Sequence, residues 1–103
     1  MSPFKRKSRY CRPFNGATFY KPRAVAMSCL EVIDLDLDEL EAMHLCDFEE
    51  LSQGESAKEM NISSSTLQRI LYSGRKKIVD ALYTKKAIKI FTPDNITIKK
   101  VNQ

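Results

Sequence analysis

The run LSQGESAKEMNISSSTLQRILYSGRKKIVDAL, residues 51–82, decides how this chain folds. Ser52 and Glu55 form a capping-box pattern, in which the serine hydroxyl accepts the amide of the third helical residue and the glutamate carboxylate accepts the serine amide. The pattern predicts a helix that begins at Gln53. Asn61 tolerates the left-handed conformation that is common just past a helix C-terminus, so we expect this helix to end there.

A second helix should follow after a short turn. Ser63 can cap it, and small or apolar residues recur at spacings of three and four as far as Leu82. We expect it to end near Tyr83 or Thr84. Because Ala57 in the first helix is small, the second helix can approach closely, and two helices that cross in this way form a helix-turn-helix.

The side chains that face outward on the second helix suit a nucleic acid. Hydroxyl, amide and guanidinium groups can recognise base edges in a major groove, and a basic cluster can contact the flanking phosphates. The expected DNA-binding residues are Ser63, Ser64, Ser65, Gln68, Arg69, Tyr72, Arg75, Lys76 and Lys77. An ordinary helical hairpin with solvated basic residues is the alternative interpretation.

Charge is divided into three blocks along the 103 residues, although the net charge is only +4. Residues 1–23 carry seven Lys or Arg and no acid, and residues 24–51 carry nine acids and no Lys or Arg. Residues 52–103 carry ten basic and four acidic residues. This segregation predicts that the basic parts bind phosphate, while the acidic segment faces away from DNA or toward a basic partner.

The first 12 residues are basic and lack apolar periodicity, so we interpret them as a flexible arm that contacts DNA phosphates, with a merely disordered terminus as the alternative. Asn15-Gly16, between Phe14 and Phe19-Tyr20, predicts a small hairpin. The expected phosphate-contacting residues of the arm are Lys5, Arg6, Lys7, Arg9 and Arg12.

An acidic helix should precede the two helices of the motif. Residues 30–35 form a short apolar run typical of a strand, and Asp36 with Glu39 repeats the capping-box pattern. A helix should therefore run from Leu37 to about Phe48, with its acids near the positive end of the helix dipole.

The C-terminal residues predict a β-hairpin. Isoleucines alternate with polar residues on both sides of Pro93-Asp94, which gives one apolar face formed by Ile88, Ile90, Ile96 and Ile98. A lone hairpin is marginally stable, so this face should pack on the helices, pair with residues 30–35, or form the interface of a symmetric dimer. The predicted domains are a basic arm (1–23), a helical helix-turn-helix domain (24–84) and the hairpin (85–103).

A set of residues between about Tyr20 and Ile90 matches one protein family. The set is Lys21-Pro22, residues 37–42 with Leu45 and Asp47, residues 51–53 with Ala57 and Met60, Ser63 with Thr66, Arg69 and Ile70, Arg75 with Lys77, residues 80–82, and Ala87-Ile88 with Ile90. With this set the chain resembles domain-of-unknown-function family 134, small prokaryotic proteins predicted to bind DNA through a helix-turn-helix related to sigma-factor region 4. The resemblance implies three helices, with the acidic helix first.

The chain departs from this family at the start of the second motif helix. Ser64 and Ser65 stand where the family usually has arginine or a bulky polar residue, and Asn61 replaces the usual turn glycine. We expect these changes to alter the choice of DNA site rather than the fold.

Metal, redox and enzyme chemistry are weakly indicated. Cys11, Cys29, Cys46 and His44 include no Cys-x-x-Cys pair, and His44 and Cys46 point in different directions on one helix, so buried thiols and a surface histidine are expected. The sequence contains no glycine-rich phosphate loop and no nucleophile pattern, so we expect no enzyme, cofactor or metal. We expect no membrane segment, and a cytoplasmic, nucleoid-associated protein.

The expected fold is therefore mainly α, a three-helix core that contains a helix-turn-helix, with short strands or a hairpin at the C-terminus. The expected function is sequence-specific binding of double-stranded DNA by a homodimeric transcriptional regulator, with RNA polymerase or another transcription protein as a further partner. The alternative is a protein-interaction module that docks on the transcription machinery through its acidic helix.

Overall fold

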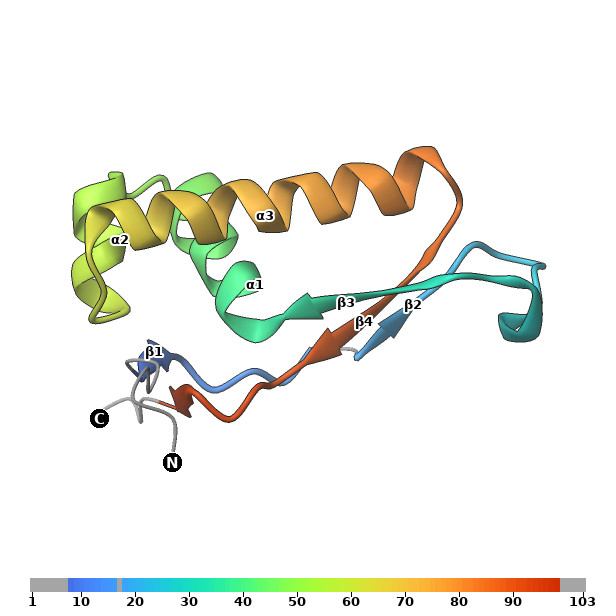
Figure 1. Ribbon diagram of the computed structural model, residues 1–103, viewed down its shortest axis with the longest axis horizontal. Coiled ribbons are helices and arrows are strands. Elements are labelled where there is room, and N and C mark those ends of the chain that lie inside the picture. The colour runs from blue at the N-terminus through green and yellow to red at the C-terminus, as the bar shows by residue number, and fades with distance from the viewer. Residues whose placement is uncertain (1–7, 17, 99–103) are drawn as a thin grey trace, which may run out of the picture.

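The computed structural model describes residues 8–16 and 18–98. The described part contains three α-helices and short strands, as the sequence predicted, and the helices lie on one side of the strands (Figure 1). The elements in chain order are β1 (Arg9–Cys11), β2 (Phe19–Tyr20), a short 3-10 helix η1 (Met27–Cys29), β3 (Val32–Asp36), α1 (Leu37–Met43), a π-helical turn η2 (His44–Phe48), α2 (Gln53–Glu59), α3 (Ser64–Tyr83), β4 (Ala87–Phe91) and β5 (Ile96–Ile98).

Local side-chain hydrogen bonds set the ends of α2 and α3, as predicted. The Glu55 amide donates to Ser52 Oγ at 3.0 Å, and the Ser52 amide donates to Glu55 Oε1 at 3.0 Å. Asn61 adopts a φ of 58° just after α2. The Thr66 amide then donates to Ser63 Oγ at 3.2 Å, which caps α3.

The acidic helix begins at Leu37, as predicted, and the Asp36 amide donates to Glu39 Oε1 at 2.9 Å. After Met43 the α-helix continues as the π-helical turn η2, in which the Glu49 amide donates to the His44 carbonyl at 2.9 Å. The predicted helical span to about Phe48 is confirmed, but the change of helix type was not predicted.

The strands pair with partners far away in the sequence. β4 is the central strand of a three-stranded sheet of order β2-β4-β3, in which β3 is parallel to β4 and β2 is antiparallel to it. β1 and β5 form a separate parallel pair. Strands from all three predicted domains thus meet in this fold, since β2, β3 and β4 share one sheet.

Both predicted hairpins are wrong. β1 and β2 flank Asn15-Gly16 but pair with β5 and β4, and β4 and β5 flank Pro93-Asp94 but pair with β3, β2 and β1. Pairing with β3 gives β4 a ladder of five residues and lets Ile88 join Leu35 and Ala81 in a buried cluster, which a hairpin would not provide. Two of the three environments predicted for this face are confirmed, because β4 pairs with β3, and Ile88 also packs against Ala81 of α3.

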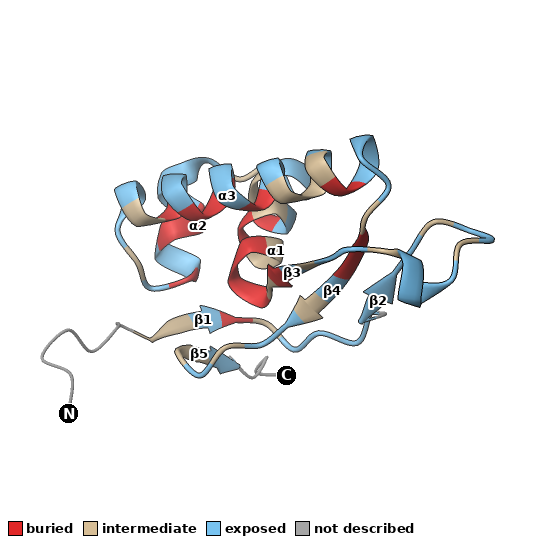
Figure 2. Cartoon of the chain, turned by 45° about the vertical axis from the view of Figure 1, so that its right-hand side comes forward, coloured by how far each residue is buried: buried red, intermediate tan, exposed pale blue. Residues whose placement is uncertain are grey.

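A buried cluster lies where the three helices meet (Figure 2). Cys11 of β1 belongs to it and is only 1% exposed, and the Tyr10 amide donates to the Met60 carbonyl at 3.0 Å. The prediction of a flexible arm up to residue 12 is therefore wrong for Arg9–Cys11, because this strand completes the core. Lys5, Arg6 and Lys7 lie outside the described residues. Over the described ranges, no helix is long and apolar enough to span a membrane.

Candidate nucleic-acid interface

The junction of α2 and α3 is a tight turn that backbone hydrogen bonds hold in place. The Asn61 amide donates to the Lys58 carbonyl at 3.1 Å, and the Ile62 amide donates to the Ala57 carbonyl at 3.0 Å. Ala57 of α2 and Met60, the residue that follows this helix, pack in the same cluster as Leu67 of α3. These contacts fix the direction in which α3 leaves the turn.

The first turns of α3 present polar side chains to solvent. Ser64, Ser65, Gln68 and Arg69 are exposed, while Leu67, Ile70 and Leu71 hold the opposite face in the core. The structure thus brings the predicted base-reading residues together on one outward face. Ser63 and Tyr72, which were also predicted to contact DNA, are exposed as well.

Hydrogen bonds among the side chains organise this end of α3. Ser63 Oγ serves as the helix cap, and it lies 3.2 Å from Ser65 Oγ and 2.9 Å from Thr66 Oγ1. Arg69 Nη2 donates to Thr66 Oγ1 at 3.4 Å, so the guanidinium leans toward the helix start. The Ser63 hydroxyl therefore has a structural role, whereas Ser64 and Gln68 extend into solvent.

Two of the three predicted phosphate contacts farther along α3 are bound to acids of the same chain. Arg75 Nη2 and Nε donate to the two Asp47 carboxylate oxygens at 2.6 and 3.2 Å, and this hydrogen bonding raises the pKa of Arg75. Lys77 Nζ donates to Glu39 Oε1 and to the Asp34 carbonyl, both at 2.8 Å. Lys76 is exposed.

Two acids of α1 are buried and paired, not solvated. Asp38 is 4% exposed and Glu39 is 5% exposed. Arg9 Nη1 lies 3.1 Å from Asp38 Oδ2, and Ser73 Oγ donates to Glu39 Oε2 at 2.5 Å. Burial raises the pKa of Asp38 above its ordinary value, and the nearby Arg9 charge only partly opposes this effect.

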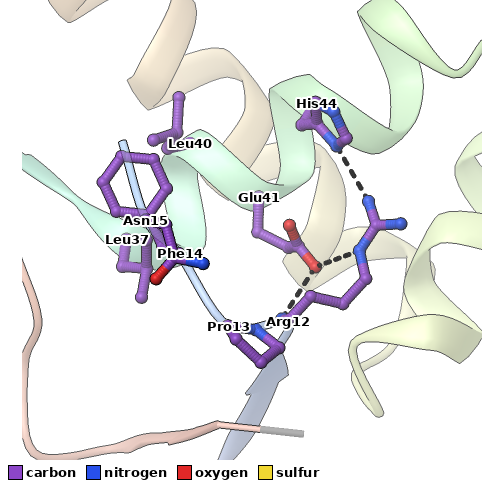
Figure 3. A pocket seen from close by; sticks show the side chains of 8 residues that line it. All are labelled: Arg12, Pro13, Phe14, Asn15, Leu37, Leu40, Glu41 and His44. Carbon is purple, nitrogen blue, oxygen red and sulfur yellow. Dashed lines mark hydrogen bonds and ion pairs between the residues drawn. The ribbon is translucent and has the colours of Figure 1, made fainter. Parts of the chain in front are cut away.

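Arg12 ties the segment after β1 to α1 and η2 (Figure 3). Its backbone amide and its Nε donate to Glu41 Oε2 at 3.1 and 3.2 Å, and its Nη2 contacts His44 Nδ1 at 2.8 Å and Glu49 Oε2 at 2.6 Å. The hydrogen bond from Arg12 lowers the pKa of Glu49. Arg12 and its neighbours also line an open hollow of about 470 Å³, whose apolar side chains are Phe14, Leu37 and Leu40.

These ion pairs explain the charge blocks in a way that the sequence reasoning missed. Basic residues of the first and third blocks neutralise acids of the second, through Arg9–Asp38, Arg12–Glu41, Arg75–Asp47, Lys77–Glu39 and Lys86–Glu31. The available signal was the opposite sign of neighbouring blocks, from which we predicted only that the acidic segment faces away from DNA or toward a basic partner. Arg9 and Arg12 thus have carboxylates where the prediction placed phosphates.

The cysteines have three different environments. Cys11 is buried, and burial raises the pKa of its thiol to about 12. Cys46 is half-buried and donates to Ser56 Oγ at 3.2 Å, whereas Cys29 is exposed. The prediction of buried thiols therefore holds for Cys11 and not for Cys29. His44 is exposed, as predicted, and stacks on Phe48 with ring centroids 5.1 Å apart.

Comparison with known proteins gives relatives without an assigned activity. A UPF0251 protein of Methanosarcina acetivorans is 44% identical over 77 residues, which are 75% of this chain and 45% of the relative. A UPF0251 protein of Dehalococcoides mccartyi is 47% identical over 72 residues, which are 70% of this chain and 62% of the relative.

The chain thus spans about half the length of the first of these relatives and less than two thirds of the second. No solved structure matches the chain significantly. The model of the family described as "Protein of unknown function DUF134" matches residues 5–98, and this chain therefore belongs to that family.

Proposed function

We propose that this chain binds double-stranded DNA in a sequence-specific manner, with α2, the turn and α3 acting as a helix-turn-helix. The observation that carries the proposal is the exposed group of Ser64, Ser65, Gln68 and Arg69 at the start of a helix whose opposite face is fixed in the core. A helix that presents hydroxyl, amide and guanidinium groups in this way can enter the major groove with its first turns.

The side chains would have distinct roles in the complex. The Arg69 guanidinium can donate to both acceptors of guanine, and the Gln68 amide can form two hydrogen bonds with adenine. Lys76 lies about two helical turns beyond Arg69 and can contact a phosphate. Arg75 and Lys77 would mainly hold α3 against η2 and α1 through Asp47 and Glu39, because these carboxylates already occupy their donors.

The rival function is docking on a transcription protein through the acidic helix. That function needs exposed carboxylates, but Asp38 and Glu39 are buried and Glu41 is held by Arg12. The burial of Asp38 and Glu39 argues against docking through these two acids. A DNA-binding chain of this kind would regulate transcription at the nucleoid in the cytoplasm, and RNA polymerase would then be a further candidate partner.

Fluorescence anisotropy with labelled duplexes at two salt concentrations tests the proposal. Direct phosphate contact makes affinity fall steeply with salt, at about 0.9 units of log affinity per log salt for each neutralised phosphate. A chain whose weak binding to duplex DNA does not depend on salt would contradict the proposal.

A matched pair of variants tests the base-reading role. Arg69→Ala should cost about 1–3 kcal/mol on the preferred site and relax the choice of sequence. Arg23→Ala removes the same charge from an exposed position before β3, and it should change affinity little. An equal loss for Arg69→Ala on every sequence would reduce this residue to a phosphate contact, and no loss would remove it from the interface.

A further inference from the structure

The outward face of α3 between Tyr72 and Tyr83 carries exposed apolar and aromatic side chains beside charged ones. Tyr72 is 77% exposed, Val79 62%, Leu82 74% and Tyr83 88%. Tyr72 and Val79 are seven residues apart, as are Arg75 and Leu82, which is the spacing of the seam along which two helices pack. The buried residues of α3 lie on the opposite face, so this seam points away from the domain (Figure 2).

We propose that the seam binds a second copy of this chain, α3 against α3 in antiparallel orientation, to form a symmetric dimer. In such a pair, the same residues of each copy form the two sides of the interface. A two-fold axis near residue 78 places Tyr72 beside Tyr83 of the second copy, and it places the aliphatic stem of Arg75 beside Leu82 of the second copy. An open hollow of about 720 Å³ between Tyr72, Val79 and Tyr83 can receive these side chains.

Charge selects the antiparallel orientation. Lys76 and Asp80 lie one turn apart on the same flank of α3, so the two-fold axis near residue 78 brings each Lys76 opposite Asp80 of the other copy. The Asp80 carboxylate is held by Lys86 Nζ at 3.1 Å and by Thr84 Oγ1 at 3.0 Å. A parallel pair would instead bring like charges together, which is unfavourable.

The size of the seam predicts a reversible dimer. Each exposed tyrosine can bury about 150–250 Å², so the two copies together would bury on the order of 1,000 Å². This area lies just below the roughly 1,200–2,000 Å² of stable interfaces, so we expect a weak, reversible dimer that forms at high protein concentration.

This interface replaces the one that the sequence predicted. Ile88 is buried in the domain, and Ile90 and Ile96 are half-buried against its core, so of the four isoleucines only Ile98 is exposed to a second copy. The physical reason is that β4 forms the centre of the sheet. Tyr72, Arg75 and Lys76, expected to contact DNA, then lie in or beside the dimer interface.

The dimer also fixes the spacing of the two DNA-binding ends, a consequence that rests on the proposed function. With a rise of 1.5 Å per residue, an axis between residues 77 and 78 or at residue 78 separates residue 66 of the two copies by about 34–36 Å. Gln68 lies on the same outward face of α3 as Tyr72, so the two DNA-binding ends point in opposite directions across the axis, and each would contact a DNA site of its own.

Sedimentation equilibrium without DNA tests the dimer by itself, at concentrations up to about 200 µM, where an interface of this size should associate. Lys76→Glu and Asp80→Lys should each weaken self-association, because each creates like charges across the axis. A mixture of the two variants should recover it, because both cross-axis pairs become opposite. Recovery on mixing cannot come from interactions within one chain.

A second matched pair locates the interface. Val79→Glu should raise the dimer dissociation constant by about tenfold or more, since it buries an unpaired charge. Val32→Glu makes the same change at an exposed position of β3 and should leave the constant unaltered. A wild-type monomer at every concentration, no recovery on mixing, or equal effects of the two valine changes would overturn the proposal.

Selection from a random duplex pool separates this inference from the proposed function. Half-sites without a fixed spacing are expected, because the two DNA-binding ends of the dimer point in opposite directions. A seam-mediated dimer that selects no duplex would contradict DNA binding but keep the interface, whereas selection of single half-sites by a monomer would overturn the dimer but keep DNA binding.

Discussion

Replacing Gly74 with alanine should destabilise the fold, although alanine is the better helix former. Gly74 lies in α3 where this helix crosses α1, and an added Cβ would lie 3.0 Å from Met43 Cε, 3.1 Å from Glu39 Cβ and 3.3 Å from the Glu39 carbonyl oxygen. The end of the methionine side chain can move. Glu39 cannot retreat easily, because its carboxylate is bonded to Ser73 and Lys77.

The magnitude is the difference between two opposing effects. Alanine should gain about 1 kcal/mol over glycine inside a helix. Overpacking a close contact typically costs about 1–3 kcal/mol. The expected net loss is therefore roughly 0–2 kcal/mol, and each kcal/mol lowers the melting temperature of a domain of this size by about 4–8 °C.

Gly54 provides the matched control. It lies in the first turn of α2, and the nearest atom to an added Cβ is Ser52 Oγ at 3.9 Å. Gly54→Ala should therefore raise the free energy of unfolding by about 0.5–1 kcal/mol. Urea denaturation followed by circular dichroism measures both variants. If Gly74→Ala stabilises the protein as much as Gly54→Ala does, α1 and α3 do not approach each other this closely.

Three further changes test the caps, the buried acid and the N-terminus. Ser52→Ala should lower the free energy of unfolding by about 0.5–2 kcal/mol in the same denaturation assay, because the Glu55 amide loses its acceptor, and unchanged stability would show that the cap contributes nothing. Burial raises the pKa of Asp38 in the folded state above its pKa in the unfolded state. The stability advantage of the wild type over Asp38→Asn should therefore decrease as the pH rises from the unfolded-state pKa to the folded-state pKa. An advantage that increases with pH would contradict the burial effect. Deletion of residues 2–7 should flatten the salt dependence of DNA affinity by up to about three units, since it removes three cations but keeps β1, and an unaltered slope would exclude Lys5, Arg6 and Lys7 as phosphate contacts.

The helix boundaries could be predicted from the sequence because their signals are local. Ser52 with Glu55, Ser63 with Thr66, and Asn61 act over three residues or fewer, and each fixes a helix end by hydrogen bonding or backbone conformation. The outward direction of Gln68 and Arg69 follows from helical periodicity in the same way. This part of the candidate site therefore required no tertiary information.

Strand partners depend on contacts that local patterns do not encode. Ile88 has an alternating pattern that suits a hairpin as well as a parallel pair with β3, and the choice depends on Leu35 and Ala81, which come from distant segments. Cys11 gives no periodic signal at all, because β1 has only three residues and a single buried side chain. Short strands of this kind are placed by the core that they complete.

The same reasoning changes what the acidic segment implies about function. The negative charge of a block of acids between two basic blocks can be compensated in two ways, by an external basic partner or by ion pairs within the fold. Asp38 and Glu39 are almost fully buried, and a buried carboxylate requires a nearby cation or hydrogen-bond donor, which Arg9, Lys77 and Ser73 provide. The acids thus hold β1 and α3 against α1, and they orient α3 so that its polar first turns face solvent. Asp38 and Glu39 of the acidic segment therefore stabilise the fold, and the case for DNA binding depends on the exposed start of α3.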